Sequence, residues 1–223
     1  MAELISQLRP QRIRANLEHL RGEVAAAAAR AGRDPEAVEV LAATKYVAAA
    51  DLGALQQAGV RLVGENRAQD LEQKVALYGD AFTWDFIGQL QSRKVRRIVP
   101  HVRLIHSVAS ESSLRELARH SDLAAPSLRI LIEVNVSGEP GKAGIEPGAL
   151  AQFLQLAPLP VVGLMTMPPM SRDPGASRPW FAALRGLAEQ HGLEQLSMGT
   201  SQDYAVAVEE GATIVRIGTK LYT

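Results

Sequence analysis

Short apolar runs alternate with segments of helical spacing along nearly the whole chain. Strict alternation of strand and helix favours parallel strands, because each parallel pair requires a long crossover connection. We therefore expect a parallel sheet covered by helices. The strand-like runs span residues 38–47, 60–66, 83–90, 102–109, 128–137, 159–169, 194–201 and 212–222.

Eight strands within 223 residues predict an α/β fold, a single (β/α)8 TIM barrel in which one domain spans residues 1–223. The alternative is an open doubly wound sheet, which usually has a Gly-rich turn after its first strand. Residues 43–51 contain no glycine. An extra N-terminal helix is expected from about Ala2 to Ala31, broken at Pro10. The other helices are expected at about 49–58, 67–77, 92–98, 111–120, 148–156, 180–191 and 202–209.

Composition narrows the functional classes. The chain has no cysteine, which excludes disulfides and thiolate chemistry, and its five histidines lack metal-ligand spacing. Lysine and arginine together balance aspartate and glutamate at 24 each, so no global charge attracts nucleic acid or an anionic membrane. No window resembles a signal peptide or a membrane span. We expect a cytoplasmic protein with no metal site.

The run 38–47 carries one lysine, Lys45, where the first strand should end. Burial of an unpaired ammonium would lower its pKa and make it a nucleophilic amine. The alternative is a lysine that extends from the strand end to solvent. The rest of the chain has to decide between these interpretations.

Polar and small residues gather at the ends of the other strand-like runs, which in a parallel barrel form the working face. Each has a structural explanation: Asn66 and Ser110 as helix N-caps, Asn135 as a turn cap, Gly88 as relief of backbone crowding. Their convergence on one rim is what indicates a binding site. The strand-end residues are Lys45, Asn66, Gly88, His106, Asn135, Met165, Ser197, Met198, Ser201, Arg216, Gly218 and Thr219.

The last two strand ends are typical of a phosphate site. Ser201 precedes a helix expected near Gln202, and a helix N-terminus favours an anion. Gly218 permits close backbone approach and Thr219 adds a hydroxyl. The alternative is that Ser201 is only an N-cap and Gly218 a steric necessity. A phosphate site across the barrel from Lys45 suggests a phosphorylated aldehyde held as a Schiff base.

Several motifs together resemble the pyridoxal phosphate homeostasis protein family, the YggS/PROSC-like proteins. The likeness runs from about Val38 to the C-terminus and includes, in order, ATK, GEN, FIGQLQSRK, IHSV, NVSGEPGKAG, GLMTMPP and LSMGTSQDYAVAVEEGATIVRIGT. The resemblance implies a fold like the N-terminal domain of alanine racemase. It also implies covalently bound pyridoxal 5'-phosphate (PLP), with little established turnover.

The resemblance implies a role for individual residues. Lys45 of ATK is similar to the lysine that forms the Schiff base with PLP. Ser201, Gly218 and Thr219 resemble the phosphate cup, and Arg216 resembles the residue that faces the pyridine nitrogen.

Further residues are placed by the same likeness with less defined roles. Asn66 and Met198 resemble pocket residues, and Asn135 and Met165 are expected to line the same mouth. The chain departs from the family at Asp85, where a histidine usually precedes FIG. Whatever that histidine does cannot be assumed here.

The resemblance and the residues together predict a carrier. PLP acts as an electron sink when its pyridine nitrogen is protonated, and an arginine opposite that nitrogen disfavours protonation. In alanine racemase the resemblance implies a tyrosine base from a second domain, and this chain ends at Thr223, so we expect no such domain. No residue is assigned a catalytic role.

We therefore expect a protein that holds PLP as a lysine aldimine and takes part in PLP homeostasis and delivery. PLP-dependent apo-enzymes are the expected partners, and the chain is expected to be a monomer. One alternative is a PLP-dependent amino-acid racemase with a single base and weak activity. Another is a class I aldolase-like barrel, which would need an acid near Lys45, and no candidate for it is evident.

Overall fold

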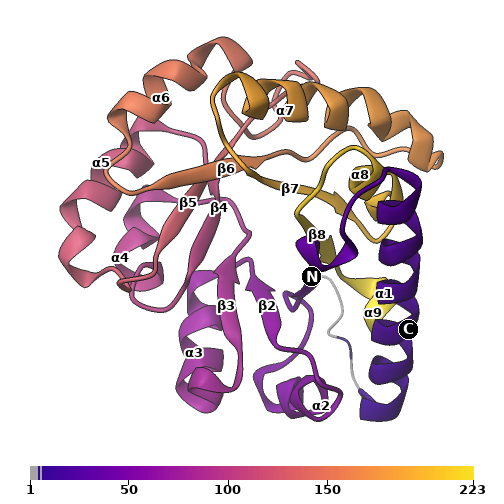
Figure 1. Ribbon diagram of the computed structural model, residues 1–223. Coiled ribbons are helices and arrows are strands. Elements are labelled where there is room, and N and C mark those ends of the chain that lie inside the picture. The colour runs from indigo at the N-terminus through magenta and orange to yellow at the C-terminus, as the bar shows by residue number, and fades with distance from the viewer. Residues whose placement is uncertain (1–4, 6) are drawn as a thin grey trace.

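The eight expected strands form a closed parallel barrel in chain order, which confirms the predicted fold (Figure 1). The computed structural model describes residue 5 and residues 7–223. The barrel closes where the first and last strands pair. The strands are β1 (Glu39–Ala43), β2 (Leu62–Glu65), β3 (Thr83–Phe86), β4 (Leu104–Val108), β5 (Arg129–Glu133), β6 (Val161–Met165), β7 (Gln195–Thr200) and β8 (Ile214–Ile217).

Helices surround this barrel, as Figure 1 shows. Short 3-10 turns at Ala49–Asp51 and Ser92–Lys94 precede two of them. The helices are α1 (Pro10–Arg30), α2 (Leu52–Gln57), α3 (Ala68–Tyr78), α4 (Val95–Ile98), α5 (Glu111–Arg119), α6 (Leu150–Leu156), α7 (Arg178–Gln190), α8 (Tyr204–Glu209) and α9 (Thr219–Tyr222).

Several predicted boundaries are wrong, and two of them lie near the ends of the chain. Helix α1 begins at Pro10 instead of near Ala2, because proline is favoured at the first helical position, where its missing N–H costs nothing. Residue 5 lies in an isolated parallel bridge with Val47, while Ala2 lies outside the described residues. At the other end, the run 212–222 is a strand only to Ile217, and residues 219–222 form α9.

The strands separate two apolar layers. Successive residues of a strand point to opposite faces, so alternate residues face the helices or the bore of the barrel. A compact cluster of Leu41, Leu104, Leu131, Met165 and Ile214 fills part of the bore. The larger cluster lies between barrel and helices. Residues two positions from a bore residue on the same strand therefore also face the bore.

Helix α1 packs along α8 and α9, the last two helices of the chain (Figure 1). Its apolar stripe includes Leu17, Leu20 and Val24, all buried. The Asn16 side chain donates hydrogen bonds to the carbonyl oxygens of Leu221 and Thr223, at 3.1 and 3.0 Å. Among the described residues, no helix is long and apolar enough to cross a membrane.

Candidate functional site

The predicted site residues lie on four neighbouring strand ends. In the pairing of β1 with β2, Ala43 lies opposite Gly64. In the pairing of β1 with β8, Ala42 lies opposite Ile217. The register thus places the end of β1, from which the turn with Lys45 follows, between the ends of β2 and β8, from which Asn66 and Gly218 follow.

The closure of the barrel also changes one expectation. Ser201 and Gly218 were expected across the barrel from Lys45, but β8 pairs directly with β1. Gly218 therefore follows the strand next to the lysine strand, and Ser201 follows the strand beyond it. The reason is topological, because the eighth strand of a closed barrel is the neighbour of the first.

Lys45 follows β1 by two residues and is exposed. Its Nζ lies 4.8 Å from the centroid of the Tyr46 ring. Of the two interpretations left open for Lys45, the structure supports the lysine that extends to solvent, since the strand ends at Ala43 and a turn carries Lys45 outward. An exposed amine at the rim of a barrel is accessible to a small aldehyde.

A buried ion pair lies directly behind this turn. The Lys74 side chain of α3 donates to the Glu65 carboxylate and, at 2.9 Å, to the carbonyl oxygen of Thr44. Thr44 donates its hydroxyl to the same carboxylate, which also accepts the N–H of Asn66 at 3.3 Å. The pair thus fixes the residues that adjoin Lys45 and Asn66. Sequence reasoning missed Lys74, whose only signal is a lysine nine residues after Glu65 on a helix.

Asn66 presents an unsatisfied polar atom. Its Oδ1 is buried and has no hydrogen-bond partner among the described residues. The alternative interpretation of Asn66 as an N-cap is wrong, because Arg67 occupies that position and α3 has no side-chain cap. A buried acceptor without a partner costs about 1–3 kcal/mol, so such a group is commonly explained by a ligand or water.

The main chain of Asn66 is held in place by Gly88. A Cβ built on Gly88 would lie 2.1 Å from the Asn66 carbonyl oxygen, a distance that no side chain tolerates. The Gly88 carbonyl oxygen in turn accepts the buried Ser107 hydroxyl. The glycine of FIGQLQ is therefore required by a close backbone approach, as the alternative interpretation held.

Two of the residues predicted to bind a phosphate, Ser201 and Gly218, are joined by one hydrogen bond. The N–H of Gly218 donates to Ser201 Oγ at 3.0 Å, which connects the loops after β7 and β8. Thr219 is exposed and begins α9, whose first N–H groups have no intrahelical partner. Gly218 has open space around it, since a Cβ there would meet no atom within 4 Å.

The helix after Ser201 starts later than expected, at Tyr204 instead of Gln202. Residues 201–203 form turns, and the Asp203 carboxylate accepts the Thr200 N–H at 2.7 Å. Asp203 also accepts the Ser177 hydroxyl at 2.8 Å. An acidic side chain thus occupies the position where sequence reasoning placed the first turn of the helix.

Arg216 lies in the bore, almost fully buried. Its guanidinium donates to Ser197 Oγ, to the Thr166 carbonyl oxygen at 3.0 Å and to Met167 Sδ. Burial lowers the pKa of Arg216 to about 10, although the negative charges of Glu133 and Asp203 oppose this. The side chain therefore remains a cation and a donor at neutral pH.

Glu133, at the end of β5, is a buried carboxyl group that interacts electrostatically with this arginine. Burial raises the pKa of Glu133, and the positive charge of Arg216 opposes the rise. The bore thus combines a buried guanidinium with a carboxyl group that resists ionisation.

Three other predicted residues differ in what they offer the site. The Met198 side chain is fully buried in the layer between barrel and helices, because it alternates with the bore residue Ser197. The Met198 side chain therefore does not face the bore, and only its main chain could contribute to the pocket. Met165 lies in the bore cluster. Asn135 is buried, but its side chain bonds to Ser137 and to the Glu139 carbonyl oxygen within its own loop.

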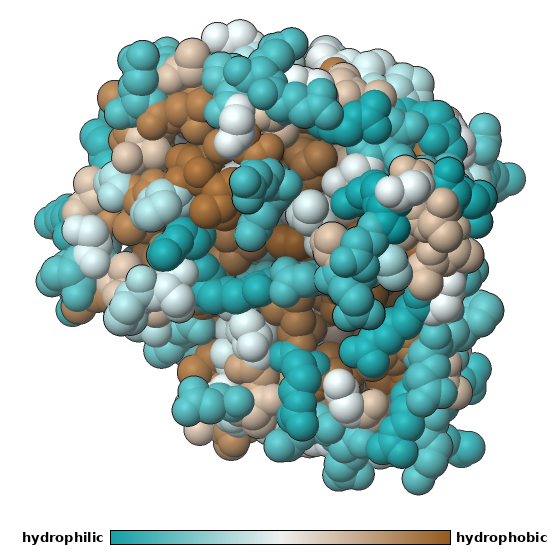
Figure 2. All heavy atoms as spheres, viewed as in Figure 1, coloured by the Kyte–Doolittle hydropathy of each residue, from teal (hydrophilic) through white to brown (hydrophobic). Residues whose placement is uncertain are grey.

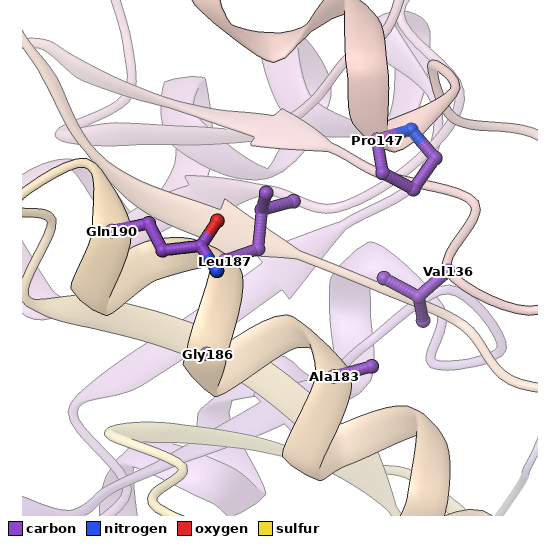
Figure 3. A pocket seen from close by; sticks show the side chains of 6 residues that line it. All are labelled: Val136, Pro147, Ala183, Gly186, Leu187 and Gln190. Atoms are coloured by element: carbon purple, nitrogen blue, oxygen red, sulfur yellow. The ribbon is translucent and has the colours of Figure 1, made fainter.

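Two cavities lie away from these residues. One of about 320 Å³ lies between α7 and the connection from β5 to α6, lined by Val136, Pro147, Ala183, Gly186, Leu187 and Gln190 (Figure 3). A larger one of about 690 Å³ lies between α1 and the first two strands. Neither lining includes a predicted site residue. In the view of Figure 1, Figure 2 shows apolar residues gathered toward the upper left and the centre, with hydrophilic residues among them and around the edge.

Comparison with known proteins identifies the family of the chain. Residues 11–223 match the model of the alanine racemase N-terminal domain. A pyridoxal phosphate homeostasis protein from Aquifex aeolicus is 39% identical over 204 residues, which cover 86% of this chain and 90% of the relative. The chain belongs to the pyridoxal phosphate homeostasis protein family.

Solved structures support this membership of the homeostasis protein family. PipY from Synechococcus elongatus, solved with PLP bound, is 32% identical with a TM-score of 0.79, covering 95% of this chain and all of that one. Alanine racemase from Bartonella henselae is similar in fold alone, at 18% identity and a TM-score of 0.71. This chain covers 61% of the length of that enzyme.

Proposed function

We propose that this homeostasis family member binds PLP covalently through Lys45 and carries it in exchangeable form. The observation that carries the proposal is that Lys45, Asn66 and Gly218 lie at adjoining strand ends, with a buried, unpartnered acceptor on Asn66. Membership in the family and the PLP named in the PipY structure support the same ligand.

The residues present fit the chemical groups of PLP. The open space at Gly218 and the hydroxyls of Ser201 and Thr219 suit a phosphate. The Asn66 acceptor would gain a partner from the ligand. The exposed Lys45 amine is accessible to the aldehyde, and exposure also favours exchange of the ligand.

PLP supplies an aldehyde that condenses with a primary amine. In that reaction a C=N bond forms between Lys45 Nζ and the aldehyde carbon, and the aldehyde oxygen leaves as water. The surrounding residues hold the lysine in place, because Thr44 is fixed by Lys74 and by Glu65.

Arg216 explains why a carrier is favoured over an enzyme. Its guanidinium is a cation at neutral pH and donates hydrogen bonds without accepting them. Facing a pyridine nitrogen, it would keep that nitrogen unprotonated and so weaken the ring as an electron sink. Carbanion chemistry is then poorly supported, whereas covalent storage of the aldehyde is not affected.

The test compares the visible absorption of three proteins titrated with PLP. Wild type and a Lys94→Ala control, which changes a lysine outside the site, should both gain the absorption of a lysine-bound chromophore. Lys45→Ala should lose that absorption and retain weaker binding through Ser201 and Gly218. A wild type that gains no such absorption would overturn the proposal. Amino-acid racemisation at enzymatic rates would instead support the single-base racemase.

The cellular role belongs to the same proposal. We infer that the protein acts as a monomer in the cytoplasm and passes PLP to apo-enzymes. The exposed leucines Leu77, Leu123 and Leu156 lie on three separate elements, and only Met167 and Met170, in the loop after β6, are exposed close together among the described residues, which favours a chain without a large apolar interface. Sedimentation of the protein alone tests the monomer, and a dimer would contradict it. An activity assay of an apo-enzyme mixed with the loaded carrier tests the transfer of PLP, and failure to gain activity would contradict it.

A further inference from the structure

A chain of polar side chains runs through the bore beneath the proposed PLP site. Arg216 on β8 donates to Ser197 Oγ on β7. Ser197 Oγ lies 2.8 Å from His106 Nδ1 on β4, and His106 Nε2 lies 3.2 Å from Asp85 Oδ2 on β3. Four strands therefore contribute one side chain each. His106, Asp85 and Ser197 are fully buried.

From Asp85 the row of polar side chains continues to the end of the barrel at which the strands begin. Arg103 donates to both oxygens of Asp85, at 2.9 and 3.2 Å, and to both oxygens of Glu39, at 2.9 and 2.7 Å. Burial alone would lower the pKa of Arg103, but its hydrogen bonds to Glu39 and Asp85 raise it overall. Glu39 lines the larger cavity beside α1. Both Asp85 oxygens thus accept from Arg103, and Oδ2 also faces His106 Nε2.

The contacts define a direction for every proton in the chain. Because Asp85 is an acceptor, His106 Nε2 carries a proton and donates it. In neutral His106 the Nδ1 atom is then an acceptor, and it receives the Ser197 hydroxyl. The Ser197 oxygen is left free to accept from Arg216. Burial lowers the pKa of His106, with Arg216 and Arg103 adding to the effect and Asp85 opposing it, which favours this neutral form.

We propose that Asp85, His106 and Ser197 are positioning residues for Arg216, a relay that fixes the histidine tautomer and so holds the guanidinium toward the ligand. The inference rests on the proposed PLP binding and goes beyond it, because none of the three residues would touch PLP. A carboxylate at Asp85 selects the tautomer of His106 that carries its proton on Nε2.

The first test uses the protein without PLP. Nitrogen-15 NMR of the histidine rings, assigned with a His106→Gln variant, should show His106 as the neutral Nε2–H tautomer. Asp85→Asn should remove that preference. Ser197→Ala should shift the Nδ1 resonance, because its hydrogen bond is lost. An Nδ1–H tautomer or a protonated ring in the wild type would overturn the relay.

The second test measures PLP. Ser197→Ala should weaken PLP binding about tenfold, as expected for loss of one hydrogen bond to a charged group, and should move the absorption maximum of the bound ligand. Ser113→Ala is the matched control, since Ser113 is equally buried and bonds to Ser110, the N-cap of α5. It should leave both quantities unchanged.

The outcomes separate the two proposals. If Ser197→Ala binds PLP with the affinity and absorption of the wild type, the relay is overturned and PLP binding stands. If the wild type takes up no PLP, the proposed function fails, and the inference about the ligand fails with it. The NMR measurement still decides whether the relay exists.

Discussion

At the scale of single residues, the buried ion pair of Lys74 and Glu65 is the strongest constraint behind the proposed site. Both side chains are almost completely buried. Removing one partner of such a pair leaves an uncompensated charge in the interior, whereas replacing both with apolar residues is often nearly neutral.

We therefore expect Lys74→Met to lower the free energy of unfolding by about 3–5 kcal/mol, measured by urea denaturation. The double variant Glu65→Leu with Lys74→Met should recover much of this loss. Lys94→Met, which changes no buried pair, should stay within about 0.5 kcal/mol of wild type. Equal losses in the single and double variants would contradict the assignment.

His106 should make stability depend on pH. Burial lowers its pKa from the ordinary value of 6.5, so below that value the unfolded chain binds a proton that the folded chain resists. Its contribution is complete above pH 6.5 and is lost as the pH falls toward the lowered pKa. The slope is at most ~1.4 kcal/mol per pH unit.

Denaturation at a series of pH values checks this expectation. The His106→Gln variant should lose less stability than wild type on acidification below the ordinary histidine pKa. His191→Gln, at the C-terminal cap of α7, is the control and should follow the wild-type profile. Parallel profiles for wild type and His106→Gln would show that His106 titrates in the same way in both states.

At the scale of elements, the loops after β2 and β3 are locked together by Gly88. Gly88→Ala forces the Asn66 main chain to move and should cost about 1–3 kcal/mol. It should also weaken PLP binding, because Asn66 moves. Gly186→Ala, in the middle of α7 with open space around it, should stabilise the protein by about 0.5–1 kcal/mol. Thermal unfolding measures both, and a neutral Gly88→Ala would contradict the close approach.

The elements could be predicted from the sequence to different degrees. All eight strands were found, because their apolar runs and the helical spacing between them are local signals. The end of β8 was missed, since residues 219–222 continue the apolar pattern and become helical only in tertiary context. The start of α1 was missed because periodic residues before Pro10 imitate a helix.

The candidate site shows the same division. Lys45, Asn66 and Gly218 could be placed at the rim because strand ends converge in a parallel barrel. The relay could not, since Asp85, His106 and Ser197 lie on three strands and their pairing depends on the register. Because adjacent residues of a strand face opposite sides, the alternation along β7 predicts that Met198 faces the helices if Ser197 faces the bore.

At the scale of the whole molecule, the barrel combines a rigid interior with an accessible rim. The bore is held by apolar packing and by the relay, while Lys45 lies exposed above it. This arrangement suits a protein that takes up PLP and releases it. The proposed storage of PLP depends on one covalent bond, between PLP and Lys45.

The most direct measurement is borohydride reduction of the PLP-loaded protein, followed by mass spectrometry of its peptides. The account predicts that one phosphopyridoxyl group is found on the peptide containing Lys45, and that the Lys45→Ala variant carries none. A wild type without the adduct, or an adduct on another lysine that persists in Lys45→Ala, would contradict it.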